Sequence, residues 1–142
     1  MAYGSVLTDV VQSSTSGTPP QFNDGNGTQT GTLCRAWVNF DGTATPPTIR
    51  ASFNVSSVTR NGTGDFTITF SNAFADGNYS VGHQLAYDTG GSTPTNYTAL
   101  SIKQGANATF NTASACRVYT VYTASGAGGP NNMEVTRLNF FR

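Results

Sequence analysis

Few residues in this chain could carry out acid–base or nucleophilic chemistry, and their neighbours explain most of them. Glycoside hydrolysis needs a pair of carboxylates around the scissile bond, but Glu134 is the only glutamate. Asp41, Asp76 and Asp88 each lie next to a glycine or one residue from it, as turn residues do. The chain has one histidine, His83, and no GxSxG sequence, so few residues are present that could form a serine or cysteine catalytic triad. We therefore predict that the chain is not an enzyme.

The cysteine and acidic residues also predict no metal site and no cofactor. Cys34 and Cys116 lie far apart in the sequence, and there is no CxxC pair, which leaves no set of zinc ligands. The segment from Asp24 to Thr28 faintly resembles a calcium loop but lacks the closing bidentate acid. Folding in a cytoplasm favours two buried free thiols, and a disulfide between two strands is the alternative.

The composition limits the class of partner. The formal net charge is 0, and charged residues make up 10% of the 142 residues. A phosphate backbone or an anionic membrane therefore has little electrostatic attraction for this chain, and we expect no nucleic-acid partner. Residues 1–14 have no basic region followed by an apolar run, and no segment is long enough to span a bilayer. We expect folding in a cytoplasm and no membrane insertion.

The chain consists of short segments in which apolar and polar residues alternate with a period of two, separated by turns rich in Gly, Asn, Asp and Pro. This pattern is typical of half-buried antiparallel strands, and no window keeps a helical period. The sequence Asn61–Gly64 indicates a hairpin. We predict an all-β, jelly-roll-like antiparallel β-sandwich of about seven to eight strands. The expected strands cover residues 33–40, 49–55, 65–70, 79–87, 96–103, 115–123 and 133–142.

The alternation also predicts which side chains enter the core. In the first strand Cys34, Ala36, Val38 and Phe40 share one face. The rings of Phe53, Phe66 and Phe70 are expected in that core as well. His83 is in register with apolar neighbours, so we expect a hydrogen-bonded histidine on the core face rather than a catalytic one. Val58 falls out of phase with the preceding row, which indicates a bulge near Ser56 and Ser57.

Two features predict contact with another copy of the chain. Trp37 lies on the polar face of its strand, so it is either covered by a neighbouring subunit or loop, or is an exposed interface aromatic. The strand over 115–123 is apolar or aromatic on both faces, as a central strand or one pressed against a partner would be. We therefore predict a homo-oligomer.

Two glycine-rich and polar segments, 88–96 and 124–132, are expected to be long loops. Tyrosines flank them, and tyrosine beside Ser, Gly and Asn suits the recognition of sugars or proteins. The alternative is that these are tyrosines at strand ends with hydroxyls in solvent. The tyrosines are Tyr87, Tyr97 and Tyr122.

Residues 1–31 are expected to form an N-terminal attachment arm, and residues 32–142 the sandwich. Residues 13–31 are dense in Gly, Ser, Thr, Pro and Asn and read as an extended linker. Before them lies a short β-prone segment that could add a strand to the edge of a sheet, in this domain, a sister subunit or another protein. A frayed terminus is the alternative. The apolar residues of this segment are Val6, Leu7, Val10 and Val11.

The sequences CRAWVNFDGT, IRASFNVSSVTRNGTGDFTITF and ADGNYSV, within about Cys34 to Val81, resemble a module of tailed phages. It occurs especially in phages of cyanobacteria and other aquatic bacteria, in tail fibre or virion structural proteins. The opening MAYGSVLTDVVQSS is similar to segments that precede such modules. The resemblance implies an all-β virion protein, often a homotrimer, with no catalytic residues to carry over. Residues beyond Gly82 match no pattern, as expected of a variable half that faces the host.

Three functions follow as expectations. The first is a tail fibre or fibre-tip protein that joins other virion proteins through residues 1–31 and contacts host surface glycan. The second is a capsid decoration or cement protein whose arm lies on neighbouring shell subunits. The third is a carbohydrate-binding module such as a cellular lectin. The first two place the protein in the virion.

Overall fold

The computed structural model describes residues 21–23, 28–30, 33–86, 97–101, 111–124 and 127–142. The chain divides into two compact units, Met1–Leu33 and Cys34–Arg142. In the first unit, β1 (Gln21–Asn23) pairs with β2 (Thr28–Thr30) as an antiparallel hairpin. The sequence had predicted an extended linker here. Asp, Asn and Gly residues between two short segments are a typical hairpin sequence, which explains the difference.

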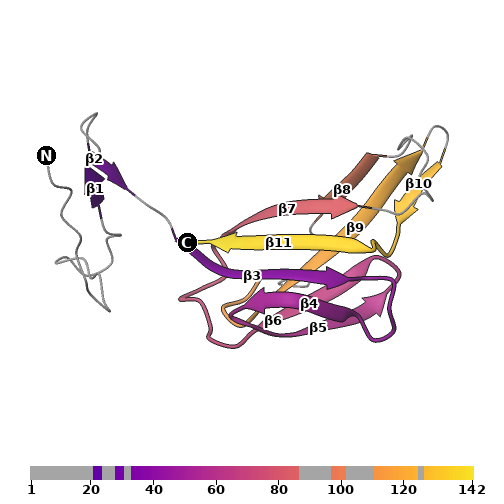
Figure 1. Ribbon diagram of the computed structural model, residues 1–142, viewed down its shortest axis with the longest axis horizontal. Coiled ribbons are helices and arrows are strands. Elements are labelled where there is room, and N and C mark those ends of the chain that lie inside the picture. Colours follow the sequence, from indigo (N-terminus) through magenta and orange to yellow (C-terminus); the bar gives the residue numbers. More distant parts are fainter. Residues whose placement is uncertain (1–20, 24–27, 31–32, 87–96, 102–110, 125–126) are drawn as a thin grey trace, which may run out of the picture. The chain divides into compact units, whose positions relative to one another are not determined.

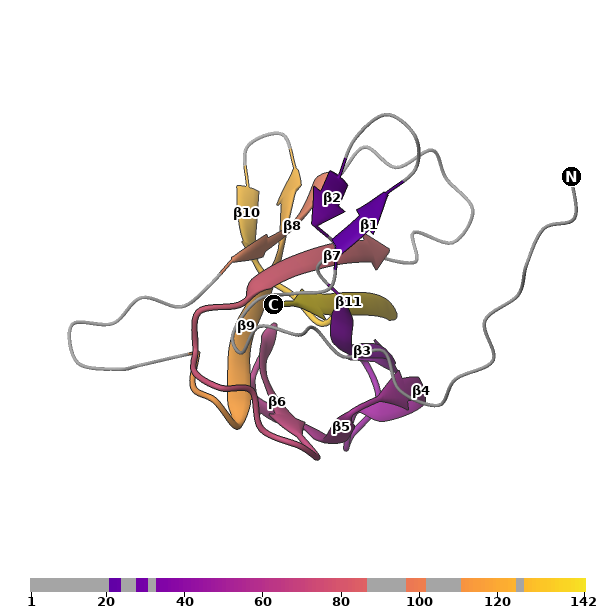
Figure 2. The ribbon, with the colours of Figure 1, turned by 90° about the vertical axis from the view of Figure 1, so that its left-hand side faces the viewer.

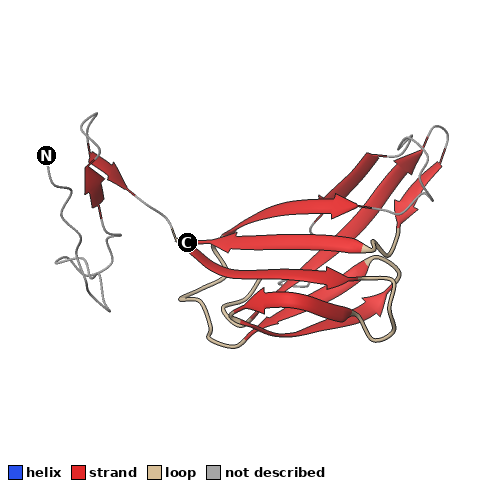
Figure 3. Cartoon of the chain, in the orientation of Figure 1, coloured by secondary structure: helices blue, strands red, loops and turns tan. Residues whose placement is uncertain are grey.

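The larger unit is built of strands, as Figures 1 and 3 show. Its described residues contain no helix, and so none that could cross a membrane. The strands are β3 (Cys34–Asp41), β4 (Thr48–Phe53), β5 (Val55–Gly62), β6 (Asp65–Phe70), β7 (Ser80–Ala86), β8 (Tyr97–Ser101), β9 (Ala115–Ala124), β10 (Ala127–Pro130) and β11 (Val135–Phe141).

These strands form two antiparallel sheets that pack face to face (Figure 1). One sheet has the order β4-β3-β11-β7. The other has the order β10-β9-β6-β5, and β8 also pairs with β9. The first and last strands of the unit, β3 and β11, are therefore neighbours in the middle of one sheet. The predicted antiparallel β-sandwich is confirmed.

The core lies between the sheets and is rich in aromatic rings. Phe40 and Phe66 come from opposite sheets, and their ring centroids are 5.2 Å apart in an edge-to-face arrangement. Phe70 lies 5.0 Å from Phe140 in the same way. Such pairs stabilise a core beyond the burial of their area. The predicted inner row of β3 is confirmed for Ala36, Val38 and Phe40, which are buried, whereas Cys34 is half-buried.

The prediction of one strand over residues 49–55 was wrong, because the chain changes sheets at Asn54. This residue has a φ of 55°, which asparagine tolerates better than most residues. Figure 2, seen along the strands, shows β4 running directly into β5. The Asn54 side chain holds the chain where it passes from one sheet to the other. Its Oδ1 accepts from the backbone N–H of Asn72 at 2.7 Å, and its Nδ2 donates to the backbone carbonyls of Arg35 and Asn72.

The prediction that Phe53 belongs to the core was also wrong. The β3–β4 register shifts so that Asn39 faces Ala51 whereas Phe40 faces Ile49. The extra residue in β4 reverses the faces of the residues that follow it, since side chains alternate along a strand. Ile49 packs on the core, and Phe53 points outward and is 54% exposed.

The predicted bulge and hairpin between β5 and β6 are confirmed. The β5–β6 register shifts between Val55 and Ser57. The strands are joined through Gly64, which is buried and has a φ of 68°. A Cβ atom on Gly64 would lie 2.5 Å from the carbonyl oxygen of Thr120, so no other residue fits this turn without movement.

Two further expectations need correction. His83 pairs with the buried Leu138, so its predicted register is right, but it is exposed because β7 is the last strand of its sheet in the described part of the chain. The loop predicted over residues 124–132 contains β10, which pairs with β9. A Gly-Gly-Pro sequence is a weak strand signal, and only the pairing with β9 makes it a strand.

Both cysteines are free thiols, and the alternative of a disulfide between them is not realised. Cys116 is fully buried, and its sulfur lies 3.2 Å from Oδ1 of Asn111. Burial raises the pKa of the Cys116 thiol to about 11, and a hydrogen bond with Tyr79 lowers it by less. The thiol is therefore neutral and serves as a small apolar side chain in the core.

Candidate binding face

One surface of the larger unit combines exposed aromatic rings with polar side chains. It is the outer face of the sheet β4-β3-β11-β7, and we name it the Trp37 face. Because successive side chains of a strand point to opposite faces, the outward residues follow from the buried ones. Its members are Trp37 and Asn39 of β3, Ala51 and Phe53 of β4, Arg137 and Asn139 of β11, and Gly82 and Gln84 of β7.

Trp37 and Phe53 form the apolar centre of this face. They are directly opposite each other in the β3–β4 ladder, and they are 37% and 54% exposed. Residues opposite each other have Cβ atoms about 5 Å apart, close enough for the two rings to form one surface. On the other side Trp37 faces Asn139, which in turn faces Gly82. Across the four strands, this row of paired residues therefore consists of two aromatic rings, the amide of Asn139 and Gly82, which has no side chain.

One guanidinium group, that of Arg137, lies beside the aromatic pair. Arg35 has no partner in β11, because the β3–β11 register shifts there, and its guanidinium lies 5.5 Å from the centroid of the buried Phe74 ring. Arg137 faces Asn39, the next outward residue of β3, and donates to Oε1 of Gln84 at 2.6 Å. Neither arginine takes part in an ion pair with a carboxylate of the described residues.

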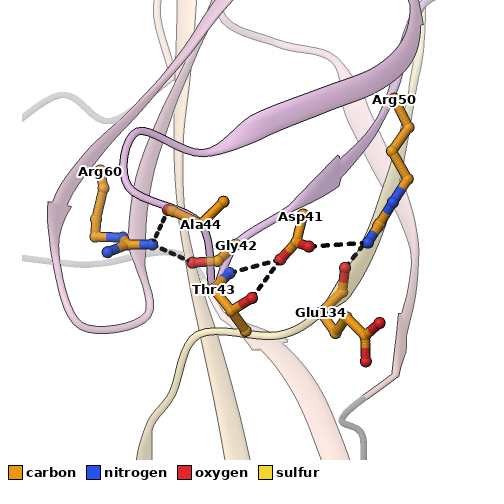
Figure 4. A network of polar contacts seen from close by, with 7 residues as sticks. All are labelled: Asp41, Gly42, Thr43, Ala44, Arg50, Arg60 and Glu134. Atoms are coloured by element: carbon orange, nitrogen blue, oxygen red, sulfur yellow. Dashed lines mark hydrogen bonds and ion pairs between the residues drawn. The ribbon is translucent and has the colours of Figure 1, made fainter.

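A network of polar contacts closes one end of the face (Figure 4). Oδ1 of Asp41 accepts from the backbone and the hydroxyl of Thr43, at 2.8 and 2.6 Å, and Oδ2 lies 3.0 Å from Nη2 of Arg50. Arg50 also donates to the carbonyl of Glu134 at 2.6 Å. The Thr43 hydroxyl and, to a smaller extent, Arg50 lower the pKa of Asp41. This carboxylate has its own partners, and through Arg50 it is linked to the residue that precedes β11.

Arg60 of β5 fixes the connection between β3 and β4 (Figure 4). Its guanidinium donates to the carbonyls of Gly42 and Ala44 and to the hydroxyl of Thr45. Gly42 is buried, and a Cβ atom there would lie 2.9 Å from the Phe66 ring and from the carbonyl of Met133. The connection is therefore anchored at several points, and it supports the edge strand β4 that carries Phe53.

The other sheet contains the most strongly perturbed carboxylate in the described residues. Asp65 is 5% exposed and accepts from Nε and Nη2 of Arg117, at 2.8 and 2.6 Å, from the Tyr119 hydroxyl at 2.5 Å and from Asn61 at 3.2 Å. The bonds from Arg117, followed by that from Tyr119, lower the pKa of Asp65 to about 2. Its oxygens are occupied by donors, so this cluster suits a structural ion pair rather than an acid–base catalyst.

Of the predicted contact residues, Trp37 lies on this face as the alternation predicted. Tyr122 is half-buried in β9 of the other sheet, so the two do not share a surface. The backbone of Tyr97 starts β8, opposite Thr123 of β9. The remaining predicted contact and attachment residues, Tyr87, Val6, Leu7, Val10 and Val11, lie outside the described residues.

Sequence reasoning missed Phe53 and Arg137. Phe53 was assigned to the core because the sheet change at Asn54 was not foreseen. The alternation of Arg137 with Leu138 and Phe140 places it outward, but nothing in the sequence says that β11 lies beside β3. The alternation within each strand shows which side chains point outward, but the sequence does not show which strands are paired.

Comparisons with known protein families, curated proteins and solved structures find no match. The face has therefore to be interpreted from its own chemistry. In the part of the chain that the structure describes, no three His, Cys, Asp or Glu side chains gather as metal ligands. The face offers rigid aromatic area, amide groups and one positive charge, which suit binding.

Proposed function

We propose that this chain is a virion structural protein of a phage, a tail fibre or fibre-tip protein, and that its larger unit contacts the host surface through the Trp37 face. The observation that carries the proposal is the exposed Trp37–Phe53 pair on a sheet. The source of the virion assignment is the sequence resemblance over about Cys34 to Val81.

The aromatic pair supports a binding role because exposing it has a cost. An aromatic side chain left in water forgoes about 1.5 to 3 kcal/mol of burial. Adjacent exposed aromatic side chains on a protein surface mark interaction sites. Trp and Arg are enriched among the residues that contribute most of the binding energy at interfaces. A central strand holds Trp37, and the anchored connection of Figure 4 supports the strand that holds Phe53. The face is thus preorganised for contact.

The division of the chain supports an attached particle protein. The first unit, Met1–Leu33, is compact by itself and contains the β1–β2 hairpin. We assign the attachment to other virion proteins to residues 1–31, through strand addition by the segment that contains Val6, Leu7, Val10 and Val11. The larger unit then remains available for the host surface and for assembly into a homotrimer.

Electron microscopy of particles labelled with an antibody to the larger unit tests this proposal. Label at the tail tip or fibres is the expected result. Label spread over the capsid shell would contradict the fibre assignment and favour the decoration protein, and particles without the chain would contradict both. Light scattering of the purified chain tests the oligomer: a trimer has three times the mass of 14.9 kDa, and a single 14.9 kDa species contradicts it.

A further inference from the structure

We infer that the Trp37 face binds an acidic saccharide, with a sugar ring stacked on Trp37 and Phe53 and its carboxylate bound by Arg137. The inference rests on the proposed function only for the origin of the saccharide, the host surface. The chemistry of the face carries the rest.

The shape of the aromatic pair fits the apolar face of a sugar ring. A pyranose presents several C–H groups on one face and its hydroxyls around the rim. The C–H groups pack on the electron-rich face of an indole or phenyl ring without loss of hydrogen bonds. Trp37 and Phe53 are neighbours across two hydrogen-bonded strands, so they offer a surface longer than one ring.

The polar neighbours suit the rim of the sugar. Asn139 is exposed and faces Trp37 directly. Gln84 uses Oε1 to accept from Arg137, which leaves its amide hydrogens to donate. Oδ1 of Asn39 is covered and has no donor among the described residues. Amide groups can both donate to and accept from sugar hydroxyls.

Charge selects an acidic saccharide over a neutral one. The whole chain has a net charge of 0, yet Arg137 lies next to the aromatic pair without a carboxylate partner in the described residues. Arg137 has five N–H donors, and among the described residues it makes one hydrogen bond, to Gln84. A guanidinium binds a carboxylate through two parallel bonds, which is among the stronger polar interactions available.

The charge of Arg137 also argues against a second copy of the chain as the occupant. Around a twofold axis near Trp37, the surfaces of both copies would be the same. Arg137 of one copy would then approach the equivalent positive charge of the other, which is unfavourable. Among the described residues of the face, no carboxylate is available to offset this, since Asp41 is paired with Arg50. A twofold contact between two Trp37 faces is therefore disfavoured.

Fluorescence tests the inference directly because Trp37 is the only tryptophan of the chain. The purified chain is titrated with oligosaccharides of polygalacturonate and of alginate, and with cellohexaose as a neutral control. We expect the emission of Trp37 to shift or be quenched with the acidic oligosaccharides alone. Raising the salt from about 50 to about 500 mM should weaken the effect, since exposed charges are screened.

Calorimetry on variants shows whether the named residues carry the binding. Trp37→Ala and Arg137→Gln should each lower the affinity for the acidic oligosaccharide about tenfold or more, the factor of a lost charged hydrogen bond or a lost ring contact. Trp37→Phe keeps an aromatic ring and should retain most of the affinity. Arg142→Gln is the matched control: Arg142 lies outside the face, paired with Asp76, and the affinity should not change.

Three results would overturn the inference. One is no change in emission or heat with either acidic oligosaccharide. The second is equal binding of cellohexaose, which would remove the role of charge. The third is a change in Trp37 emission that follows protein concentration alone, which would make the face a contact between copies. Microscopy of the particle is independent of these assays, so its failure would reject the virion assignment and leave the saccharide site standing.

Discussion

The Asp65 cluster allows the clearest quantitative prediction. The Asp65 carboxylate is almost fully buried and is held by Arg117, Tyr119 and Asn61. Asp65→Asn keeps the size of the side chain and removes the charge. The arginine and the tyrosine then lose their charged acceptor, while Arg117 can still reach water because its side chain is 32% exposed. We expect loss of stability with retention of the fold.

The magnitude follows from the pKa of Asp65. The folded chain lowers it from 3.8 to about 2, and each pKa unit corresponds to about 1.4 kcal/mol. At pH 7 the ionised carboxylate therefore contributes about 2 to 3 kcal/mol to the free energy of unfolding. Because the folded pKa lies below the unfolded one, this contribution is complete above about pH 5 and is lost as the pH falls towards 2.

Urea unfolding at several pH values measures this contribution. At pH 7 the midpoint of Asp65→Asn should lie about 1 to 2 M below that of the unchanged chain. At pH 2 the gap between the two midpoints should nearly close, because Asp65 is then protonated in the unfolded chain and about half protonated in the folded chain. Asp76→Asn serves as control, since that ion pair is exposed and should be worth less than about 1 kcal/mol. Equal midpoints at pH 7, or a gap that stays constant with pH, would refute the reasoning.

Three further experiments test the fold. Gly64→Ala should destabilise the larger unit by about 2 to 4 kcal/mol, because the positive φ and the contact with Thr120 leave no room for a methyl group; an unchanged melting temperature would contradict this. Phe66→Ala should cost about 3 to 5 kcal/mol in urea unfolding, whereas Phe53→Ser should cost less than about 1 kcal/mol, and similar losses would mean that Phe53 is a core residue. Cys116, buried and with a pKa of about 11, should resist iodoacetamide at pH 8 in the folded chain and react in urea, as mass spectrometry of its peptide can show; rapid labelling of the folded chain would contradict its burial.

Local pattern was enough to predict the fold class and much of the core. The period-two alternation over 34–40 and 65–70 identified the inner faces of β3 and β6, because side-chain direction along one strand is a local property. The Asn61–Gly64 hairpin was also predictable, since a positive φ limits the residue types that can occupy the turn. The exclusion of helix followed from composition and period alone.

Tertiary structure decided what the candidate site contains. Phe53 reached the outer face because β4 gains one residue against β3 and the chain then changes sheets at Asn54. Arg137 joined Trp37 because β11, nearly 100 residues later in the chain, pairs with β3. The physical reason is that a register shift of one residue reverses the face of all that follows, and pairing between distant strands leaves no periodic signal within either. The sequence by itself determined a sandwich of antiparallel strands with Trp37 outside its core, and only the folded chain decided which residues lie beside it.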